Sequence, residues 1–109
     1  MKRKSDFEES SGNVFADIGL SNPEEAMTKA QLAMQIIDII NRRKLSQAEA
    51  AALLGIDQPK ISSLIHGRLR GFSVERLFRF LNALGREVEI VVRAKKGRSA
   101  KPGVRVLAA

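Results

Sequence analysis

Apolar residues recur along the middle of the chain at the spacing of helices, and four successive stripes stand out. The first runs from Pro23 or Thr28 to Arg43, two short ones follow within residues 46–67, and a fourth begins after Ser73. Recurrence at i, i+3 and i+4 predicts helices that bury one side. The residues of the first helix that are expected to face the core are Ala30, Ala33, Met34, Ile37, Ile40 and Leu45.

The ends of the two short helices carry capping signals. Ser46 with Glu49 three residues later has the form of a capping box, and Gly55 can end that helix in a left-handed conformation. Asp57 and Ser73 are typical N-caps of the third and fourth helices. Two short helices joined by a glycine turn predict a helix-turn-helix, whose second helix lies in the DNA major groove.

The outer surface of the third helix is polar once Ile61 and Leu64 face inward. Gln58 can pair with adenine N6 and N7, and Lys60 can donate to guanine O6 and N7, because major-groove reading needs paired donors and acceptors. Lys60 could equally contact a phosphate, and the whole polar set could simply solvate an amphipathic helix. The candidate base readers are Gln58, Lys60, Ser62 and Ser63.

Candidate phosphate contacts flank this two-helix unit. Gln47 begins the second helix, where free backbone N–H groups favour anions. The basic residues at the end of the first helix could instead compensate its dipole, and His66 could sit at the negative end of its own helix. The full set is Gln47, Arg43, Lys44, His66, Arg68 and Arg70.

Residues 86–93, REVEIVVR, alternate polar and branched apolar side chains and predict one β-strand. A single strand is not stable alone, and no second convincing strand is present. The simplest partner is the same strand of another copy, in an antiparallel pair about a two-fold axis. Val88, Ile90 and Val92 are the expected dimerisation residues.

Charge divides the chain into three parts. Nineteen Lys and Arg against twelve Asp and Glu give a net charge of +7. Residues 1–27 hold three basic and six acidic side chains (−3), residues 28–92 ten and six (+4), and residues 93–109 six and none (+6). We predict a partly disordered acidic arm over 1–26, a DNA-binding domain over 27–93 and a basic flexible tail over 94–109.

The arm is too polar for a core element, yet it carries scattered apolar residues. An acidic, intermittently apolar segment suits folding onto a basic protein partner. Its candidate partner-binding residues are Phe7, Val14, Phe15, Ile18 and Leu20.

Several classes of function are disfavoured by what the sequence lacks. It contains no cysteine, no apolar run long enough to span a membrane and no apolar signal region. No phosphate-cradling glycine loop and no His and carboxylate cluster with metal-ligand spacing is present, so we expect neither an enzyme nor a cofactor or metal. A cytoplasmic, nucleoid-associated protein is the simplest interpretation.

With these residues in place, the chain resembles the Cro/C1-type, or XRE, helix-turn-helix family, and most closely its HigA-like antitoxin branch. The resemblance covers Val14 to Arg93, through NVFADIGLSNPEEAMTKAQL, LSQAEAAALLGIDQPKISSLIHGRLRGFS and ERLFRFLNALGREVEIVV. It implies a lambda-repressor-like bundle of four to five helices that dimerises. Pro59 stands where many relatives have a polar reader.

The resemblance also implies a function. Such proteins repress their own operon at a palindromic operator and neutralise a RelE- or HigB-like mRNA-cleaving toxin. A stand-alone, phage-like regulator without a toxin is the first alternative. The second is an interaction or RNA-binding protein whose basic tail does the binding.

Overall fold

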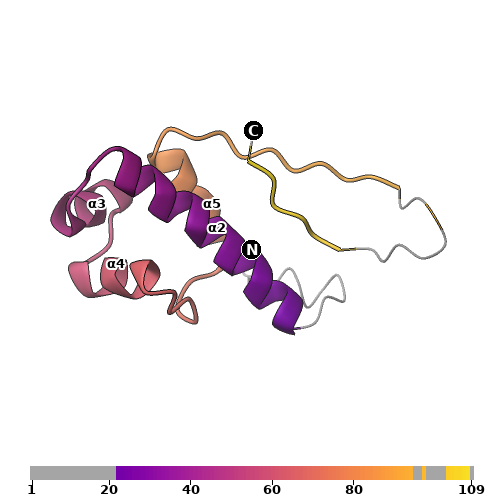
Figure 1. Cartoon of the computed structure of the whole chain (residues 1–109), viewed down its shortest axis with the longest axis horizontal. Helices are drawn as coiled ribbons and strands as arrows, with labels where there is room; N and C mark the ends of the chain where they lie inside the picture. The colour runs from indigo at the N-terminus through magenta and orange to yellow at the C-terminus, as the bar shows by residue number, and fades with distance from the viewer. Residues whose placement is uncertain (1–21, 95–96, 98–102, 109) are drawn as a thin grey trace, which may run out of the picture.

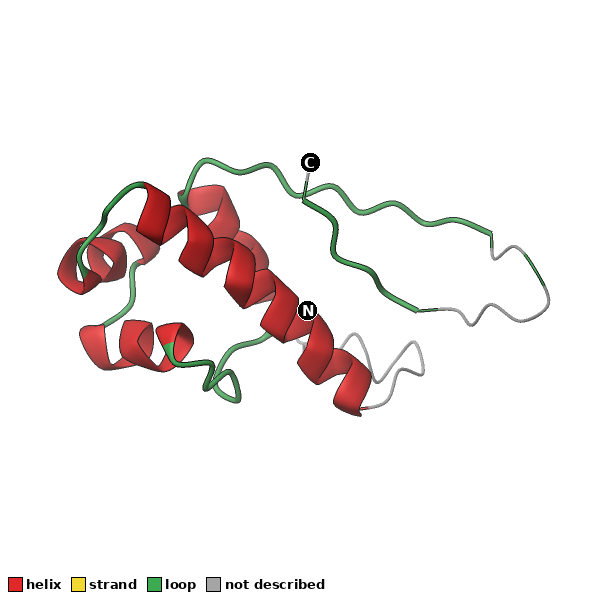
Figure 2. Ribbon diagram, viewed as in Figure 1, coloured by secondary structure: helices red, strands yellow, loops and turns green. Residues whose placement is uncertain are grey.

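The computed structural model describes residues 22–94, 97 and 103–108 and folds them into four α-helices. In the labels of Figure 1, α2 spans Asn22–Arg42, α3 Gln47–Leu54, α4 Gln58–Ile65 and α5 Val74–Ala83. Figure 2 shows the rest of the described chain as loops, with no β-strand among these residues. The mainly α fold is therefore confirmed. No helix in this part of the chain has both the length and the apolar character to cross a membrane.

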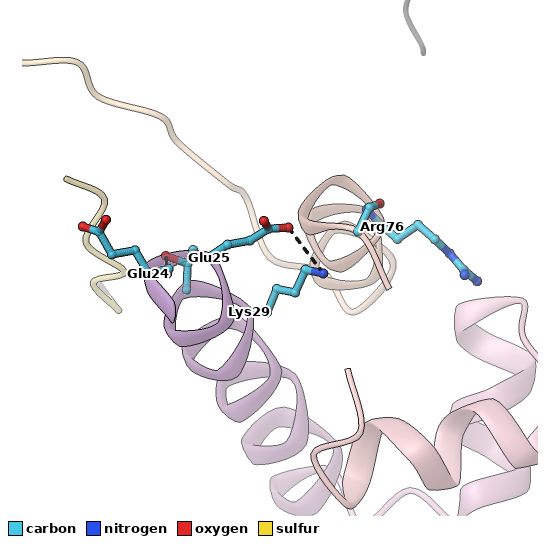
Figure 3. A network of polar contacts seen from close by, with 6 residues as sticks. Glu24, Glu25, Lys29 and Arg76 are labelled. Carbon is cyan, nitrogen blue, oxygen red and sulfur yellow. Dashed lines mark hydrogen bonds and ion pairs between the residues drawn. The ribbon is translucent and has the colours of Figure 1, made fainter. Parts of the chain in front are cut away.

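The long helix α2 begins at Asn22, which agrees with the earlier of its two predicted starts. Glu25 lies in the first turn, where a carboxylate meets the positive end of the helix. Its Oε2 is 3.5 Å from the Lys29 Nζ one turn later, an ion pair drawn in Figure 3. The helix thus includes residues 22–26, which the charge pattern alone places in the arm.

All four helices contribute to one apolar core. Helix α2 packs on α5 and α3 packs on α4, while α2 also contacts α4 and α3 contacts α5. The largest fully buried side chains are Ile36 from α2, Ile61 and Leu64 from α4, and Leu77 from α5. Because two of these four belong to α4, this short helix is held firmly by its inner face.

The inward side of α2 differs from the predicted one. Met34, expected to face inward, is 67% exposed, whereas Leu32 and Ile36 are buried. Of the predicted set, Ala33 and Ile40 are buried, Ala30 and Ile37 are half-buried, and Leu45 packs against the core. The helix carries apolar residues on several sides, so spacing alone does not fix its rotation, and packing against α5 and α4 selects the buried side.

The capping signals around the central turn are confirmed. The Ser46 Oγ accepts from the Glu49 N–H at 3.0 Å, and the Glu49 Oε1 accepts from the Ser46 N–H at 2.8 Å. Gly55 ends α3 with a φ of 71°, a conformation that costs glycine little. The Asp57 Oδ1 then accepts from the Lys60 N–H at 2.9 Å and starts α4 at the next residue.

After α5 the chain runs extended over residues 86–94 (Figure 1). The predicted strand over 86–93 is not formed here, because a strand requires a paired neighbour and no described residue pairs with it. Val88 is partly buried against the core. Val106 makes the same kind of contact from residues 103–108, where the sequence predicts a flexible tail.

Candidate nucleic-acid interface

The first turn of α4 presents polar side chains to solvent. Gln58 and Lys60 are exposed, as is Pro59 between them. Beneath them Ile61 and Leu64 have no exposed surface, so the helix is anchored from below while its N-terminal end stays accessible. Pro59 lies in the first turn, where a missing N–H breaks no helical hydrogen bond. This turn has the accessibility and donor set that major-groove reading requires.

The two serines of α4 are less accessible than the first turn. Ser62 and Ser63 are half-buried. The His66 Nδ1 lies 2.7 Å from the Ser62 carbonyl oxygen and 3.4 Å from its Oγ. One ring nitrogen of His66 therefore lies against a backbone carbonyl oxygen at the C-terminal end of α4. The sequence predicts His66 either at this negative helix end or in contact with a phosphate. The hydroxyl of Ser62 has the ring of the C-cap residue His66 as its neighbour, which leaves Gln58 and Lys60 as the strongest candidates for base contacts.

The start of α3 offers unoccupied backbone donors. Ser46 caps the N–H groups of Glu49 and Ala50, through its hydroxyl and its carbonyl oxygen respectively. The N–H groups of Gln47 and Ala48 make no hydrogen bond to another described residue. Since Gln47 is also exposed, its side chain and these two donors form one polar end of a helix.

The basic residues after α2 have different surroundings from one another. The Arg42 Nε is 3.0 Å from the Asp38 Oδ2, and the Arg43 Nη1 donates to the Leu84 carbonyl oxygen at 3.4 Å. Arg43 thus connects the end of α2 to the end of α5. Lys44 is exposed and has a φ of 55°, a left-handed conformation uncommon outside glycine. Of the two predicted phosphate contacts in this stretch, Arg43 and Lys44, the side chain of Lys44 is the more accessible to a phosphate because Arg43 already donates to Leu84.

The loop from α4 to α5 carries the other predicted cations. Arg68 and Arg70 are exposed. The loop is fastened to the helices at Phe72, which is buried and contacts the Phe80 ring edge-to-face at 5.8 Å. The two arginines therefore extend from a loop whose end is fixed in the core.

Arg76 is a residue that the sequence analysis missed. Its guanidinium lies 5.3 Å from the centre of the Phe72 ring and 5.5 Å from that of Phe80, and it donates to the Gly71 carbonyl oxygen at 3.5 Å. Figure 3 shows its side chain directed away from the ion pair on α2. Such cation–π contacts stabilise the loop. Phe72 and Phe80 lie four residues before and four residues after Arg76, and this spacing is the sequence signal that could have indicated the contacts.

The capping box changes the ionisation of its own carboxylate. The pKa of Glu49 is lowered from 4.5, first by the hydrogen bond from the Ser46 N–H and then by the Ser46 hydroxyl. Because the folded pKa lies below the unfolded one, this carboxylate stabilises the fold above about pH 4.5, and the contribution is lost as pH falls through the folded pKa.

We therefore expect Ser46→Ala to raise the pKa of Glu49 toward 4.5 by removing the hydroxyl. The measurement is a carboxyl-carbon NMR titration of Glu49 in both proteins. Glu75, in the first turn of α5 and remote from Ser46 in sequence, serves as the internal reference. Identical titration of Glu49 with and without the Ser46 hydroxyl would contradict the capping-box account.

The remaining predicted residues fall into two groups. The residues predicted to bind a toxin, Phe7, Val14, Phe15, Ile18 and Leu20, lie outside the described residues. Of the predicted dimerisation residues, Val88 is half-buried, while Ile90 is 73% and Val92 is 91% exposed. In the described part of the chain, no group of three or more His, Cys, Asp or Glu side chains is arranged to hold a metal ion.

Comparison with known proteins assigns the family. A family model described as a helix-turn-helix domain matches residues 14–93, the span over which the motifs resemble XRE proteins. A solved structure described as a "Putative XRE Family Transcriptional Regulator" is 50% identical, with a TM-score of 0.79, and the match covers 82% of this chain and 100% of that one. No curated protein matches. The chain therefore belongs to the XRE family of helix-turn-helix transcriptional regulators.

Proposed function

We propose that this protein is a sequence-specific, DNA-binding repressor whose helix α4 enters the major groove. The observation that carries the proposal is the first turn of α4, where Gln58 and Lys60 are exposed while Ile61, the next residue of the helix, is fully buried. A reading helix must combine accessible donors with a rigid position. Gln58 and Lys60 would contact bases, with Ser62 and Ser63 in a lesser role because they are half-buried.

Phosphate contacts would orient this helix on the duplex. Gln47 and the free N–H groups at the start of α3 suit one phosphate, and the exposed Lys44, Arg68 and Arg70 suit others. Contacts of this kind carry no sequence information. They make the affinity depend steeply on salt, because each neutralised phosphate releases condensed counterions.

We expect Arg70→Ala to weaken binding to all DNA sequences alike. The slope of log K against log salt concentration should become shallower by about 0.9 for each phosphate that the variant no longer neutralises. Fluorescence anisotropy with one operator and one unrelated duplex, over a salt series, measures this slope. Arg79→Ala, which removes an exposed arginine from α5 outside the α3–α4 unit, is the matched control. An unchanged slope in the Arg70 variant would remove this residue from the phosphate contacts.

Binding as a dimer would account for the apolar residues beyond α5. Two copies related by a two-fold axis would place their α4 helices in successive major grooves, about 34 Å apart on a palindromic operator. An antiparallel pair of the 86–93 segments centred on Ile90 sets Val88 opposite Val92 of the partner subunit. The same register sets Glu87 opposite Arg93 of the partner subunit. Apolar side chains would therefore pair with apolar ones, and an acidic side chain with a basic one.

We further propose that this repressor is an antitoxin that autoregulates its operon and neutralises an mRNA-cleaving toxin of the RelE or HigB type. Support comes from the resemblance to HigA-like proteins and from composition: residues 6–25 hold six acidic and no basic side chains, together with Phe7 and Phe15. A segment of this kind complements a basic protein. A stand-alone regulator without a toxin is the alternative.

Deletion of residues 1–21 tests the antitoxin proposal and leaves α2, which begins at Asn22, intact. We expect the truncated protein to bind operator DNA but to lose rescue of cell growth when co-expressed with the product of the adjacent gene. Full-length protein should copurify with that product. Copurification that survives the deletion overturns the role of the arm. No copurification with full-length protein, while operator binding persists, favours the stand-alone regulator.

A further inference from the structure

Residues 103–108 lie outside the four helices and the proposed DNA-facing surface, yet one of them contacts the apolar core. Val106 is partly buried against the core, as Val88 is in the segment 86–94. Figure 1 shows residues 103–108, in yellow, running back toward the helices after the chain has extended away from them. Val104 and Leu107 are 40% and 74% exposed.

Both extended segments have free backbone groups. No backbone N–H or C=O of residues 87–94 or 103–108 hydrogen-bonds to another described residue. Ile90, Val91 and Val92 are exposed on the first segment. Exposed branched side chains on an unpaired extended backbone are a template for strand pairing, and proteins normally cover such an edge.

The two core contacts indicate how the segments would pair with each other. Setting Val88 opposite Val106 in an antiparallel pair sets Ile90 opposite Val104. On the other face, the same register sets Glu89 opposite Arg105, two opposite charges. A slip by one residue would turn one segment's valines away from the core, so the contacts of Val88 and Val106 fix the inward face of each segment, and we choose the register that sets these two valines opposite each other.

We propose that residues 103–108 form the outer strand of a hairpin with 86–92, and that this hairpin pairs with the hairpin of a second copy. The inference rests on the dimer proposed above and extends it. Residues 103–108 occupy one edge of the 86–92 strand, which leaves its other edge for the partner. A second copy fits that edge, because the register centred on Ile90 is self-complementary, as a two-fold interface requires. The dimer then contains a four-stranded sheet with 86–92 of each chain at its centre.

The outer strand has a defined effect on association. A paired hairpin holds residues 86–92 extended before the partner arrives, so binding costs less conformational freedom. Removing the outer strand deletes three cross-strand pairs, among them Glu89 with Arg105. The dimer of a protein truncated after Ala94 should therefore dissociate about tenfold more readily in sedimentation experiments without DNA.

Introduced cysteines test the strand pairing directly, because the chain has no cysteine of its own. Glu89→Cys with Arg105→Cys should form a disulfide within one chain, detected by mass spectrometry under mild oxidation. Glu89→Cys with Val104→Cys is the control, since these side chains would lie on opposite faces of the hairpin. Ile90→Cys alone should form a disulfide between two copies, because Ile90 would lie on the two-fold axis.

The double charge swap Glu89→Arg with Arg105→Glu separates pairing from a loss of folding. Each single substitution should weaken the dimer, and the swap should restore it. A Glu89 and Arg105 cysteine pair that stays reduced, together with a truncated protein that dimerises as well as the full chain, overturns the outer strand and leaves the dimer standing. Failure of Ile90→Cys to cross-link, in a protein that sediments as a monomer, overturns the dimer itself.

Discussion

Replacing Leu64 with alanine should lower the free energy of unfolding by about 2–5 kcal/mol, the cost of deleting a buried leucine side chain and leaving a cavity. Leu64 has no exposed surface and anchors α4 to the core shared by all four helices. Small domains have about 5–15 kcal/mol of stability in total, so this single change removes a large fraction. Urea unfolding followed by circular dichroism measures the decrease.

The matched control for this prediction is Leu53→Ala. Leu53 lies in the neighbouring helix α3 but is 39% exposed, so the same chemical change removes far less buried surface. Leu53→Ala should lower the free energy of unfolding clearly less than Leu64→Ala does. The test is which of the two variants is destabilised more, not the size of either decrease. Equal destabilisation of the two proteins would show that Leu64 is not the anchor of α4 that the core packing indicates.

The ends of the short helices could be predicted from the sequence because their determinants are local. Ser46 and Glu49, or Asp57 and the N–H three residues later, complete their hydrogen bonds within one turn. No distant residue is needed, so a short stretch of sequence contains the whole interaction. The position of α4 and its exposed polar end follow from these caps, and the helix-turn-helix was predictable for the same reason.

The rotation of α2 and the state of the last segments depend on residues far away in the sequence. Met34 is exposed because packing on α5 and α4 selects another side of a helix that carries apolar residues on several sides. Arg43, predicted as a phosphate contact, also donates to the Leu84 carbonyl oxygen 41 residues later, a contact that spacing could not indicate. Arg76 differs from these cases, because its contacts with Phe72 and Phe80 are local in sequence but depend on how the loop before α5 closes.

On the proposed DNA-facing surface, the sequence offers no reason to rank one of the four candidate base readers above another. Gln58, Lys60, Ser62 and Ser63 all lie on the outer side of the predicted helix. In the folded chain the serines are half-buried, and the Ser62 carbonyl oxygen lies 2.7 Å from the His66 ring. Accessibility therefore shifts the expected base contacts toward the N-terminal turn of α4.

Gln58→Ala should reduce discrimination among operator variants by about 1–3 kcal/mol, or roughly 5- to 150-fold in relative affinity. The side-chain amide of Gln58 offers one donor and one acceptor, the pair that adenine N7 and N6 complement. It is exposed at the first position of α4, directly after the Asp57 cap. Removing it deletes the paired contact and leaves the capping hydrogen bond between Asp57 and Lys60 in place.

The chain supplies a closely matched control in Gln47, which occupies the first position of α3. Gln47→Ala should weaken binding to every sequence by a similar factor, because its expected contact is a phosphate. Both variants are compared with wild-type protein on DNA selected from a randomised pool and on single-base variants of it, by fluorescence anisotropy at fixed salt. If Gln58→Ala leaves the ranking of these sequences unchanged, base reading does not depend on this residue. If Gln47→Ala alters the ranking, the division between base contacts on α4 and phosphate contacts on α3 is wrong.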